Sequence, residues 1–374
     1  MKRLVLLGGG HTHVEVLRAF ATEPVTGAQI TLVSPFAELL YSGMIPGWIA
    51  GHYQHDDCAI PLKPLATAAR ADFVQAAATG IDAAKRRIQL SDGREIGYDV
   101  LSVDIGGVMD RDTIAGSREH GLFLRPIEHF ATLWDAVLRL AAERSLYIVV
   151  IGGGAAGAEI AMALQYRLGE RARVSLVTGG GPPLPSHPPV VQQRVQRGLR
   201  RLNITEFDEA CVEVTATHVV LASGVRLACE APVMAIGNSA PKWLAASGLA
   251  LDEHGCILTG PTLQSTSHAQ VFAVGDVATR IDMAHPKSGV YAVRAGAPLA
   301  LNLRRFVAAG ALQPHLPKVT SLNLVSCGKR YAIASWSGLS FEGTWVWHWK
   351  DHIDRSFVAR FPSTKGSEEP AASA

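Results

Sequence analysis

Two glycine-rich turns have the spacing that brings a protein backbone close to a phosphate. The first, Gly8-Gly9-Gly10-His11-Thr12-His13, follows an apolar run from residue 2 to 7 and precedes a helical pattern. The second, Gly152-Gly153-Gly154-Ala155-Ala156-Gly157, follows the apolar run 146–151. In such a turn the first glycine allows the tight bend, and the second lets a pyrophosphate approach the N-terminus of the next helix. Each turn therefore predicts a dinucleotide site, and the second is more specific because it has all three glycines.

Both units depart from the usual pattern. His13 stands where the first turn needs its third glycine, which predicts a slightly wider contact between helix and strand. An acidic residue ordinarily ends the second strand and holds a ribose hydroxyl, but here the first unit has Ser34, with Glu38 four residues on. The second unit has Thr178, with neither an acid nor an arginine beside it. The choice between NADH and NADPH is therefore left open.

A third element is the run 271–276 (VFAVGD), a strand that ends in Gly275-Asp276. A carboxylate at that point can bind the hydroxyls of a polyol chain. The alternative is that Asp276 caps the helix that follows. With two glycine turns upstream, we favour the polyol site.

The elements around these turns form a repeated pattern. Strand, glycine turn, helix and strand occur once from residue 2 and again from residue 146, which indicates two Rossmann units in series. We therefore predict an α/β fold with two Rossmann-like dinucleotide-binding domains, the first interrupted by the second, and a small C-terminal α+β region. The predicted boundaries are 1–110 and 262–312 for the first domain, 111–261 for the second, 313–362 for the C-terminal region, and 363–374 for a disordered tail.

Composition excludes several other classes. The 374 residues carry a net charge of +2, which gives no electrostatic case for nucleic-acid binding. No stretch approaches the ~20 apolar residues of a membrane helix. The five cysteines include no CxxC or CxxxxC pair, so we expect reduced thiols in a cytosolic protein and neither a disulfide framework nor a zinc site. His52 and His55 have a metal-like spacing, but no third ligand accompanies them, and no metal is predicted.

Three tryptophans near the C-terminus alternate along the chain. Trp345, Trp347 and Trp349 would share one face if this segment were a strand. Such a face could form a site for a quinone or another acceptor, a dimer surface, or part of the core. Burial in the core or at an interface is the favoured interpretation.

The three motifs together resemble a known group of enzymes. The runs 8–18 (GGGHTHVEVLR), 152–159 (GGGAAGAE) and 272–278 (FAVGDVA) are similar to those of the pyridine nucleotide-disulfide oxidoreductase superfamily. Within it, the chain resembles the branch that contains type II NADH dehydrogenases and sulfide:quinone reductases. The runs 41–53, 285–296 and 347–357 resemble flavoproteins found alone or fused ahead of selenophosphate synthetase. The resemblance covers residues 1 to about 360.

This resemblance implies FAD and NAD(P)H as cofactors. It implies that Gly8, Gly10 and His11 hold the FAD pyrophosphate, that Ser42, Gly43 and Met44 approach the isoalloxazine, and that Asp276 binds the ribityl chain. It puts Gly106 and Gly107 at the crossover between the domains. It implies that Lys287 lies near the flavin pyrimidine end as the catalytic cation, against the alternative of a solvated lysine. The full predicted cofactor-binding set is Gly8, Gly10, His11, Thr12, Ser34, Ser42, Gly43, Met44, Gly106, Arg125, Gly152, Gly154, Ala155, Ala156, Gly157, Glu159, Gly237, Gly275 and Asp276.

The predicted activity is an FAD-dependent NAD(P)H oxidoreductase that passes hydride to the flavin and electrons to a second acceptor. The resemblance suggests a quinone as the acceptor. Disulfide reductases carry a CxxxxC pair beside the flavin, whereas only Cys58 lies in that region here, so no redox-active disulfide is expected. Two alternatives remain open: a slow redox-sensing flavoprotein that regulates a partner such as a selenium-pathway enzyme, and a biosynthetic tailoring enzyme. We expect a cytoplasmic protein, with membrane contact peripheral at most and a homodimer left open.

Overall fold

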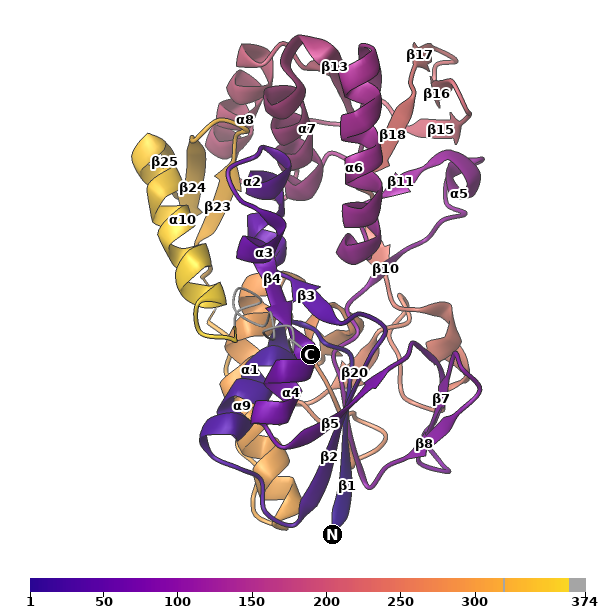
Figure 1. Cartoon of the computed structure of the whole chain (residues 1–374), viewed down its shortest axis with the longest axis vertical. Helices are drawn as coiled ribbons and strands as arrows, with labels where there is room; N and C mark the ends of the chain where they lie inside the picture. Colours follow the sequence, from indigo (N-terminus) through magenta and orange to yellow (C-terminus); the bar gives the residue numbers. More distant parts are fainter. Residues whose placement is uncertain (319, 363–374) are drawn as a thin grey trace, which may run out of the picture.

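Two five-stranded sheets organise the chain in a computed structural model, which describes residues 1–318 and 320–362 (Figure 1). The predicted tail, 363–374, lies outside the described residues. In the first sheet the strand order is β21 (Val271–Ala273), β9 (Val100–Val103), β1 (Lys2–Leu7), β2 (Ala28–Ser34), β5 (Ala71–Gln75). In the second it is β11 (Leu122–Phe123), β18 (Ala231–Met234), β12 (Leu146–Ile151), β13 (Ala172–Val177), β14 (Thr205–Phe207). Every pairing in both sheets is parallel, which confirms the predicted α/β fold with two Rossmann-like units.

The apolar runs become the central strands of these sheets. In β12, which reads LYIVVI, every residue except Tyr147 is buried, as expected for a parallel strand covered on both faces. In each sheet the first strand of the unit lies in the middle, and the chain leaves it in opposite directions. The glycine turns therefore lie at the point where the strand order reverses, which is where open α/β sheets bind ligands.

Helices cover the two sheets and join them to the smaller elements. The α-helices are α1 (His11–Thr22), α2 (Ile45–Ile49), α3 (His55–Cys58), α4 (Leu62–Ala68), α5 (Ser117–His120), α6 (Ile127–Glu143), α7 (Ala155–Leu168), α8 (Pro189–Arg201), α9 (Gly289–Val307) and α10 (Thr344–Val358). The short 3-10 helices are η1 (Ser42–Met44), η2 (Gly169–Arg171), η3 (Lys242–Ala246) and η4 (Gly275–Val277). The smaller sheets of the two large units are β3 (Glu38–Leu40) with β4 (Ala59–Pro61), β6 (Ala78–Asp82) with β7 (Arg87–Leu90) and β8 (Glu95–Gly97), β10 (Val108–Met109) with β19 (Asn238–Ser239), β15 (Cys211–Val214) with β16 (His218–Leu221) and β17 (Arg226–Ala228), and β20 (Ile257–Thr259) with β22 (Ala278–Arg280).

Helix α9 returns from the end of the chain to pack on α1. Gly296 lies so close to Glu15 that any larger side chain would overlap it. At the start of the two helices, the Thr12 hydroxyl donates a hydrogen bond to the carbonyl of Ala292 at 2.8 Å. The first glycine turn is thereby fixed against a helix whose contacting residue lies 280 positions further along the chain.

The C-terminal region is a three-stranded sheet with one helix across it. The sheet is antiparallel and consists of β23 (Asn323–Ser326), β24 (Ala332–Trp336) and β25 (Leu339–Gly343). In Figure 1 this sheet and α10, drawn in yellow, lie beside α2 and α8. The helix also contacts α3 and η1.

The three alternating tryptophans lie on the helix α10, so they do not share the single face that a strand would give them. Trp345 and Trp349 are four residues apart, and their rings stack with centroids 6.4 Å apart on the exposed side. Trp347 points to the opposite side and is 6% exposed. Aromatic alternation favours a strand, but the ion pairs of this segment have helical spacing, as between Asp351 and Arg355.

A buried ion pair fastens α10 to the rest of the molecule. Lys350 Nζ lies 2.6 Å from the Asp354 carboxylate, and both side chains are less than 10% exposed. The same ammonium group donates a hydrogen bond to the carbonyl of Gly43 in η1. Burial of Asp354 raises the pKa of its carboxyl, although the charge of Lys350 opposes that shift. Each charge is therefore tolerated only because the other is present.

Lys350→Met should destabilise the protein by roughly 3–5 kcal/mol, because it leaves the buried carboxylate of Asp354 without its partner. The double variant Lys350→Met/Asp354→Leu should be the more stable of the two, since it removes both charges. Urea unfolding followed by circular dichroism measures the difference. Arg355→Gln, in the half-exposed pair with Asp351, is the control and should cost less than about 1 kcal/mol. Equal costs for Lys350→Met and Arg355→Gln would contradict this account.

Candidate functional site

The first glycine turn closes around a buried aspartate. Gly8 has φ +99°, and a Cβ there would overlap the carbonyl oxygen of Asp104. A Cβ on Gly10 would lie 2.5 Å from the carboxyl carbon of the same aspartate. Because Asp104 directly follows β9, the ends of β1 and β9 can meet only if both positions are glycine.

His13 fills the place of the missing third glycine. Its ring is fully buried, with Nδ1 2.6 Å from the carbonyl of Gly8 and Nε2 2.8 Å from Ser102 Oγ. A carbonyl can only accept, so Nδ1 carries the proton and Nε2 accepts from the serine. Burial lowers the pKa of His13 to about 4, so the ring is neutral at physiological pH. The extra space predicted from the sequence is thus occupied by a hydrogen-bonded imidazole.

Asp104 is a site residue that the predicted set omits. Its Oδ2 atom accepts hydrogen bonds from the backbone N–H groups of Thr12 and His13, each at 2.9 Å. Burial raises the pKa of this carboxyl to about 7, although the two amide hydrogen bonds oppose the shift. The one signal in the sequence is an acidic residue directly after a short, mostly apolar strand.

Four of the predicted residues meet at the carboxyl ends of the first sheet. Asp276 Oδ2 accepts from Asn238 Nδ2 at 3.0 Å and lies 3.2 Å from Arg125 Nη1. His11 Nε2 lies 3.3 Å from Ser42 Oγ. Burial, followed by the nearby charge of Arg125, lowers the pKa of His11 to about 4. A neutral imidazole, a hydroxyl, a guanidinium and a carboxylate together supply donors and acceptors for a ribityl chain and a flavin ring.

The structure brings the other predicted residues of this unit to the same edge. Met44 is buried between η1 and the C-terminal sheet. Gly106 has φ +68°, and the Asn238 amide lies against the adjacent Gly107. Ser34 ends β2, where its hydroxyl accepts a hydrogen bond from the amide of Phe36. Glu38, four residues on, is paired with His55 at 3.1 Å and so faces away from that strand end.

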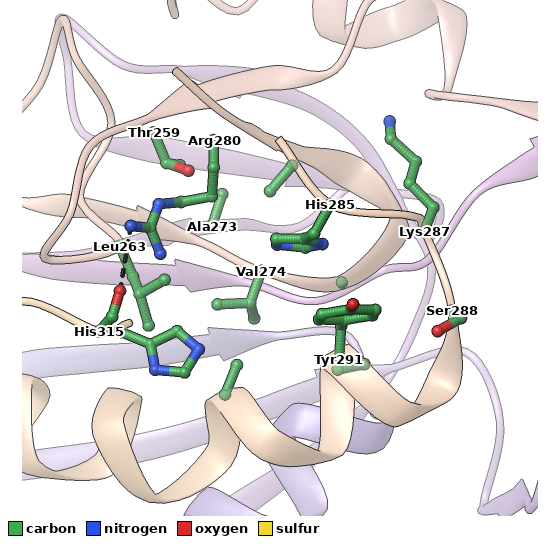
Figure 2. Close-up of a pocket in the computed structure, with 14 residues that line it drawn as sticks. Thr259, Leu263, Ala273, Val274, Arg280, His285, Lys287, Ser288, Tyr291 and His315 are labelled. Carbon is green, nitrogen blue, oxygen red and sulfur yellow. Dashed lines mark hydrogen bonds between the residues drawn. The ribbon is translucent and has the colours of Figure 1, made fainter. Parts of the chain in front are cut away.

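Lys287 contacts a buried thiol. Its Nζ atom lies 2.6 Å from Cys256 Sγ, and that sulfur lies 3.7 Å from the carbonyl of Asp276. Figure 2 shows the lysine pointing away from a hollow beside Gly275. Its predicted place at the flavin pyrimidine end stays a prediction, with the thiol between the ammonium group and the Gly-Asp motif.

The hollow in Figure 2 lies between the start of α9 and the strands β20 to β22. The rings of His285 and Tyr291 stack across it with centroids 4.6 Å apart. Arg280 pairs with Asp282 at 2.7 Å and donates to the carbonyl of His315 at 3.1 Å. These contacts hold the segment that leads into α9 against the Gly-Asp motif.

The second glycine turn is tightly packed on one side and open on the other. Gly152 has φ +134°, and a Cβ there would overlap the carbonyl of Ala235. Gly157 lies against the carbonyl of Gly152, as the third glycine of the fingerprint requires. In contrast, a Cβ on Gly154 or Gly237 would meet no described atom within 4 Å. The N-terminus of α7, at Ala155 and Ala156, is therefore accessible to a pyrophosphate.

The ribose end of the second unit carries two acidic residues that the sequence analysis missed. Thr178 directly follows β13 and lines a hollow with Glu206 and Asp208. These two acids come from the neighbouring strand β14 and the loop after it. Asp208 accepts hydrogen bonds from the Gly181 amide and from the Thr178 hydroxyl. The expectation that no acid lies near Thr178 was wrong, because the residues adjacent in space come from a different strand.

Glu159 lies on the far side of α7 from the second glycine turn. Its carboxylate accepts a hydrogen bond from the amide of Ser326 in β23 at 2.7 Å. Burial raises its pKa to about 7, although the charge of Lys350 and the Ser326 amide oppose the shift. The residue therefore faces the C-terminal region.

The cysteines and the two histidines His52 and His55 have their own environments in the structure. All five cysteines are free, and burial raises the pKa of Cys58 to about 12, so this thiol is not a thiolate nucleophile. His52 donates to the carbonyl of Gly328 at 2.8 Å, and His55 pairs with Glu38. No cluster of three metal-ligating side chains occurs within residues 1–318 and 320–362.

Comparison with known proteins identifies the family. A model of the pyridine nucleotide-disulphide oxidoreductase family matches residues 2–296, which include both glycine turns and the Gly-Asp motif. The chain belongs to this family. It is an FAD-dependent NAD(P)H oxidoreductase, and the glycine cradles at Gly8, Gly10 and Gly154 fit the two dinucleotides.

Individual relatives agree with this assignment. The chain is 27% identical over 287 residues to the demethylphylloquinone reductase NdbB of Synechocystis, which covers 73% of this chain and 71% of that protein. Its fold is similar to that of sulfide:quinone oxidoreductase from Aquifex aeolicus, with a TM-score of 0.79, 17% identity, and coverage of 96% and 91%. It is also similar to NDH2 from Plasmodium falciparum, solved in complex with NADH, with a TM-score of 0.78, 13% identity and 99% coverage of both chains. Other curated relatives are matched over 32% to 98% of their own length.

The two carboxylates near Thr178 should make NADH the preferred donor, because a 2′-phosphate would meet like charge there. We expect kcat/KM for NADH to exceed that for NADPH by at least about tenfold. Asp208→Asn combined with Glu206→Gln should narrow the ratio mainly through a lower KM for NADPH. Steady-state kinetics with both nucleotides measures it. Asp252→Asn, a change in a carboxylate that bonds Thr279 in the other unit, is the control. An unchanged ratio in the double variant would contradict this reading of the hollow.

Proposed function

We propose that this oxidoreductase passes electrons from NAD(P)H to a quinone, and that groups beneath α10 supply the protons. Reduction of a quinone to a quinol consumes two electrons and two protons. Bound FAD would supply the electron relay, by accepting hydride from NAD(P)H and releasing two electrons to the acceptor. The protein must then deliver the protons to the site.

The observation that carries the proposal is a connected set of buried titratable groups behind η1. The Tyr41 phenol donates a hydrogen bond to Asp354, which pairs with Lys350 at 2.6 Å. Lys350 also donates to the carbonyl of Gly43, one of the residues predicted to approach the flavin ring. Glu159 lies close enough to Lys350 and Asp354 for their charges to act on its pKa. The contacts thus connect Tyr41, Asp354, Lys350 and Gly43, and Glu159 lies within reach of their charges.

Two groups in this set, Glu159 and Tyr41, have the properties of a proton carrier. Glu159, with its pKa raised to about 7 by burial, holds and releases a proton near neutral pH. Burial raises the pKa of Tyr41 well above its ordinary value, so the phenol stays protonated until a base beside it accepts the proton. Tyr41 lies between Asp354 and His11, whose ring centroid is 5.5 Å from its own. The tyrosine is thus the link between the buried pair and the cofactor crevice.

Support also comes from the relatives. The Synechocystis relative is named as a reductase of a quinone, and the Aquifex neighbour as a sulfide:quinone oxidoreductase. Both names describe those proteins. They make a quinone the first class of acceptor to test on this chain.

Tyr41→Phe should slow the reoxidation of the reduced protein by a soluble quinone about 10- to 100-fold, because it breaks the proton path. Reduction by NADH should keep its wild-type rate, since hydride transfer needs no proton from this path. Stopped-flow absorbance of the flavin separates the two half-reactions. The matched control is Tyr53→Phe, which removes a phenol that bonds Asp351 on the same helix but away from η1.

The outcomes separate the proposal from its alternatives. Equal reoxidation rates for Tyr41→Phe and Tyr53→Phe would contradict the proton path. A wild-type reduced protein that persists for minutes with excess quinone would contradict the quinone reductase and favour a redox sensor. A purified protein that shows no flavin absorbance after incubation with FAD would contradict FAD binding, on which the quinone reductase and its alternatives all depend.

We further propose that the protein binds peripherally to a membrane through its C-terminal region. No helix within the described residues is long and apolar enough to cross a membrane. Large apolar side chains are nonetheless exposed on the β24–β25 hairpin and α10: Trp336, Leu339, Phe341, Trp345, Trp349 and Ile353. Helix α8, which packs against this hairpin, carries four arginines. Arg200 and Arg201 lie in its last turn, whereas Arg194 and Arg197 pair with Glu342 of the hairpin. Exposed aromatic rings beside a basic helix suit the surface of an anionic bilayer.

Trp345→Glu combined with Trp349→Glu should reduce binding to phosphatidylglycerol-containing vesicles by at least about tenfold. The substitutions place charge where apolar rings would enter the lipid boundary. Co-sedimentation with vesicles measures the bound fraction. Leu140→Glu, at an exposed apolar position on α6, is the control and should bind like wild type. A different outcome would contradict membrane binding: wild-type protein that does not bind vesicles but dimerises, while the tryptophan variant is monomeric. In that case the aromatic surface would bind a second copy of the chain.

A further inference from the structure

Asp104 lies at the meeting point of three strand ends, where a cofactor phosphate would be expected. It follows β9 directly, between the Gly8–Gly10 turn after β1 and the Gly275-Asp276 motif after β21. A Cβ on Gly10 would lie 2.6 Å from Asp104 Oδ1, and a Cβ on Gly275 would lie 2.7 Å from the same atom. The carboxyl group therefore faces both glycines that line the crevice, and Oδ1 is its oxygen on the side of Gly275.

The other carboxyl oxygen, Oδ2, binds some of the backbone N–H groups at the N-terminus of α1, where a cofactor phosphate would also bind. Four N–H groups at a helix start have no partner within the helix. Asp104 Oδ2 accepts those of Thr12 and His13. The N–H groups of Gly10 and His11 make no hydrogen bond to any described residue. One end of α1 thus has two amides held by a carboxyl and two left for an anion.

An ionised Asp104 and a pyrophosphate cannot both bind here without a large repulsion. Both are anionic, and the site is buried, so the repulsion is weakly screened. Asp276, in η4, adds a further negative charge, and it is paired with Arg125 rather than with Asp104. His11 and His13, on α1, are neutral because burial lowers the pKa of each to about 4. No positive side chain among these neighbours pairs with the Asp104 carboxylate.

We propose that Asp104 binds FAD as a neutral carboxylic acid, so that the cofactor binds together with one proton. In this form Oδ2 keeps the amides of Thr12 and His13, and Oδ1–H donates to a pyrophosphate oxygen. The inference rests on the assignment of the α1 end to FAD. Asp104 is then a cofactor-binding residue that senses pH, in addition to capping the helix.

The direction of the pH dependence follows from the protonation state of the free protein. Burial raises the pKa of Asp104 to about 7, so below about pH 6 the acid is already neutral and binding takes up no proton. Above pH 7 the proton must come from solvent. The dissociation constant for FAD should therefore be constant at low pH and rise up to about tenfold per pH unit at high pH.

The test is a titration of the full-length, flavin-free protein with FAD between pH 6 and pH 9. Fluorescence quenching gives the dissociation constant, and calorimetry in phosphate and in Tris, which differ in ionisation heat, counts the protons. Wild type should take up close to one proton at pH 8. Asp104→Asn, which keeps an acceptor and a donor without the charge, should bind FAD with no pH slope and at least tenfold more tightly than wild type at pH 9. Glu128→Gln, which neutralises another buried carboxyl of raised pKa, should keep the wild-type slope.

Two results would overturn the proposal. One is measured on the wild-type protein alone: a dissociation constant for FAD that does not change from pH 6 to pH 9, with no proton uptake. The other is an Asp104→Asn protein that keeps the full slope. Gly10→Val tests the premise that FAD binds at the start of α1. If this variant still binds FAD, the cofactor lies elsewhere and the premise fails. If the variant loses FAD binding but the wild type takes up no proton, only the role of Asp104 is refuted.

Discussion

The carboxyl group of Asp104, which accepts hydrogen bonds from the Thr12 and His13 amides of α1, is the contact on which the cofactor crevice depends. It joins the end of β9 to the start of the first helix. Gly8, Gly10 and Gly275 lie so close to it that a side chain at any of the three would overlap Asp104. Parallel strands bring their carboxyl ends to one edge, so residues from distant parts of the chain must meet there. The order β21-β9-β1 decides that the meeting residues are the Gly-Asp motif, Asp104 and the first turn.

The two Rossmann units solve the same packing problem in different ways. In the second unit Gly157 lets α7 lie directly on the turn. In the first unit His13 takes that position, and its ring bridges the Gly8 carbonyl and the Ser102 hydroxyl. The imidazole replaces van der Waals contact by two buried hydrogen bonds. A buried histidine is tolerated in place of glycine because Ser102 of β9 lies where its hydroxyl can donate to the second ring nitrogen.

The C-terminal region contributes buried polar contacts as well as cover. Helix α10 brings Lys350 and Asp354 under η1, while β23 brings the Ser326 amide to Glu159 of the second unit. A segment without any nucleotide fingerprint therefore joins both units at one place. Its outer side carries the stacked pair Trp345 and Trp349, so the same helix has a polar buried face and an aromatic exposed face.

The sequence by itself determined the fold class and the two glycine turns, because local spacing fixes both. Strand, turn and helix follow one another within twenty residues, and the tight bend at Gly8 or Gly152 needs glycine whatever the rest of the chain does. Only the tertiary structure decided which side chains complete the sites. Asp104 and Asp208 each reach a helix or strand end through a neighbour in the sheet, and sequence distance does not reveal which strands become neighbours. The tertiary structure also decided which way the three tryptophans point. Alternating residues share one face only when the backbone is extended, and this segment is a helix held by contacts such as that of Lys350 with Gly43.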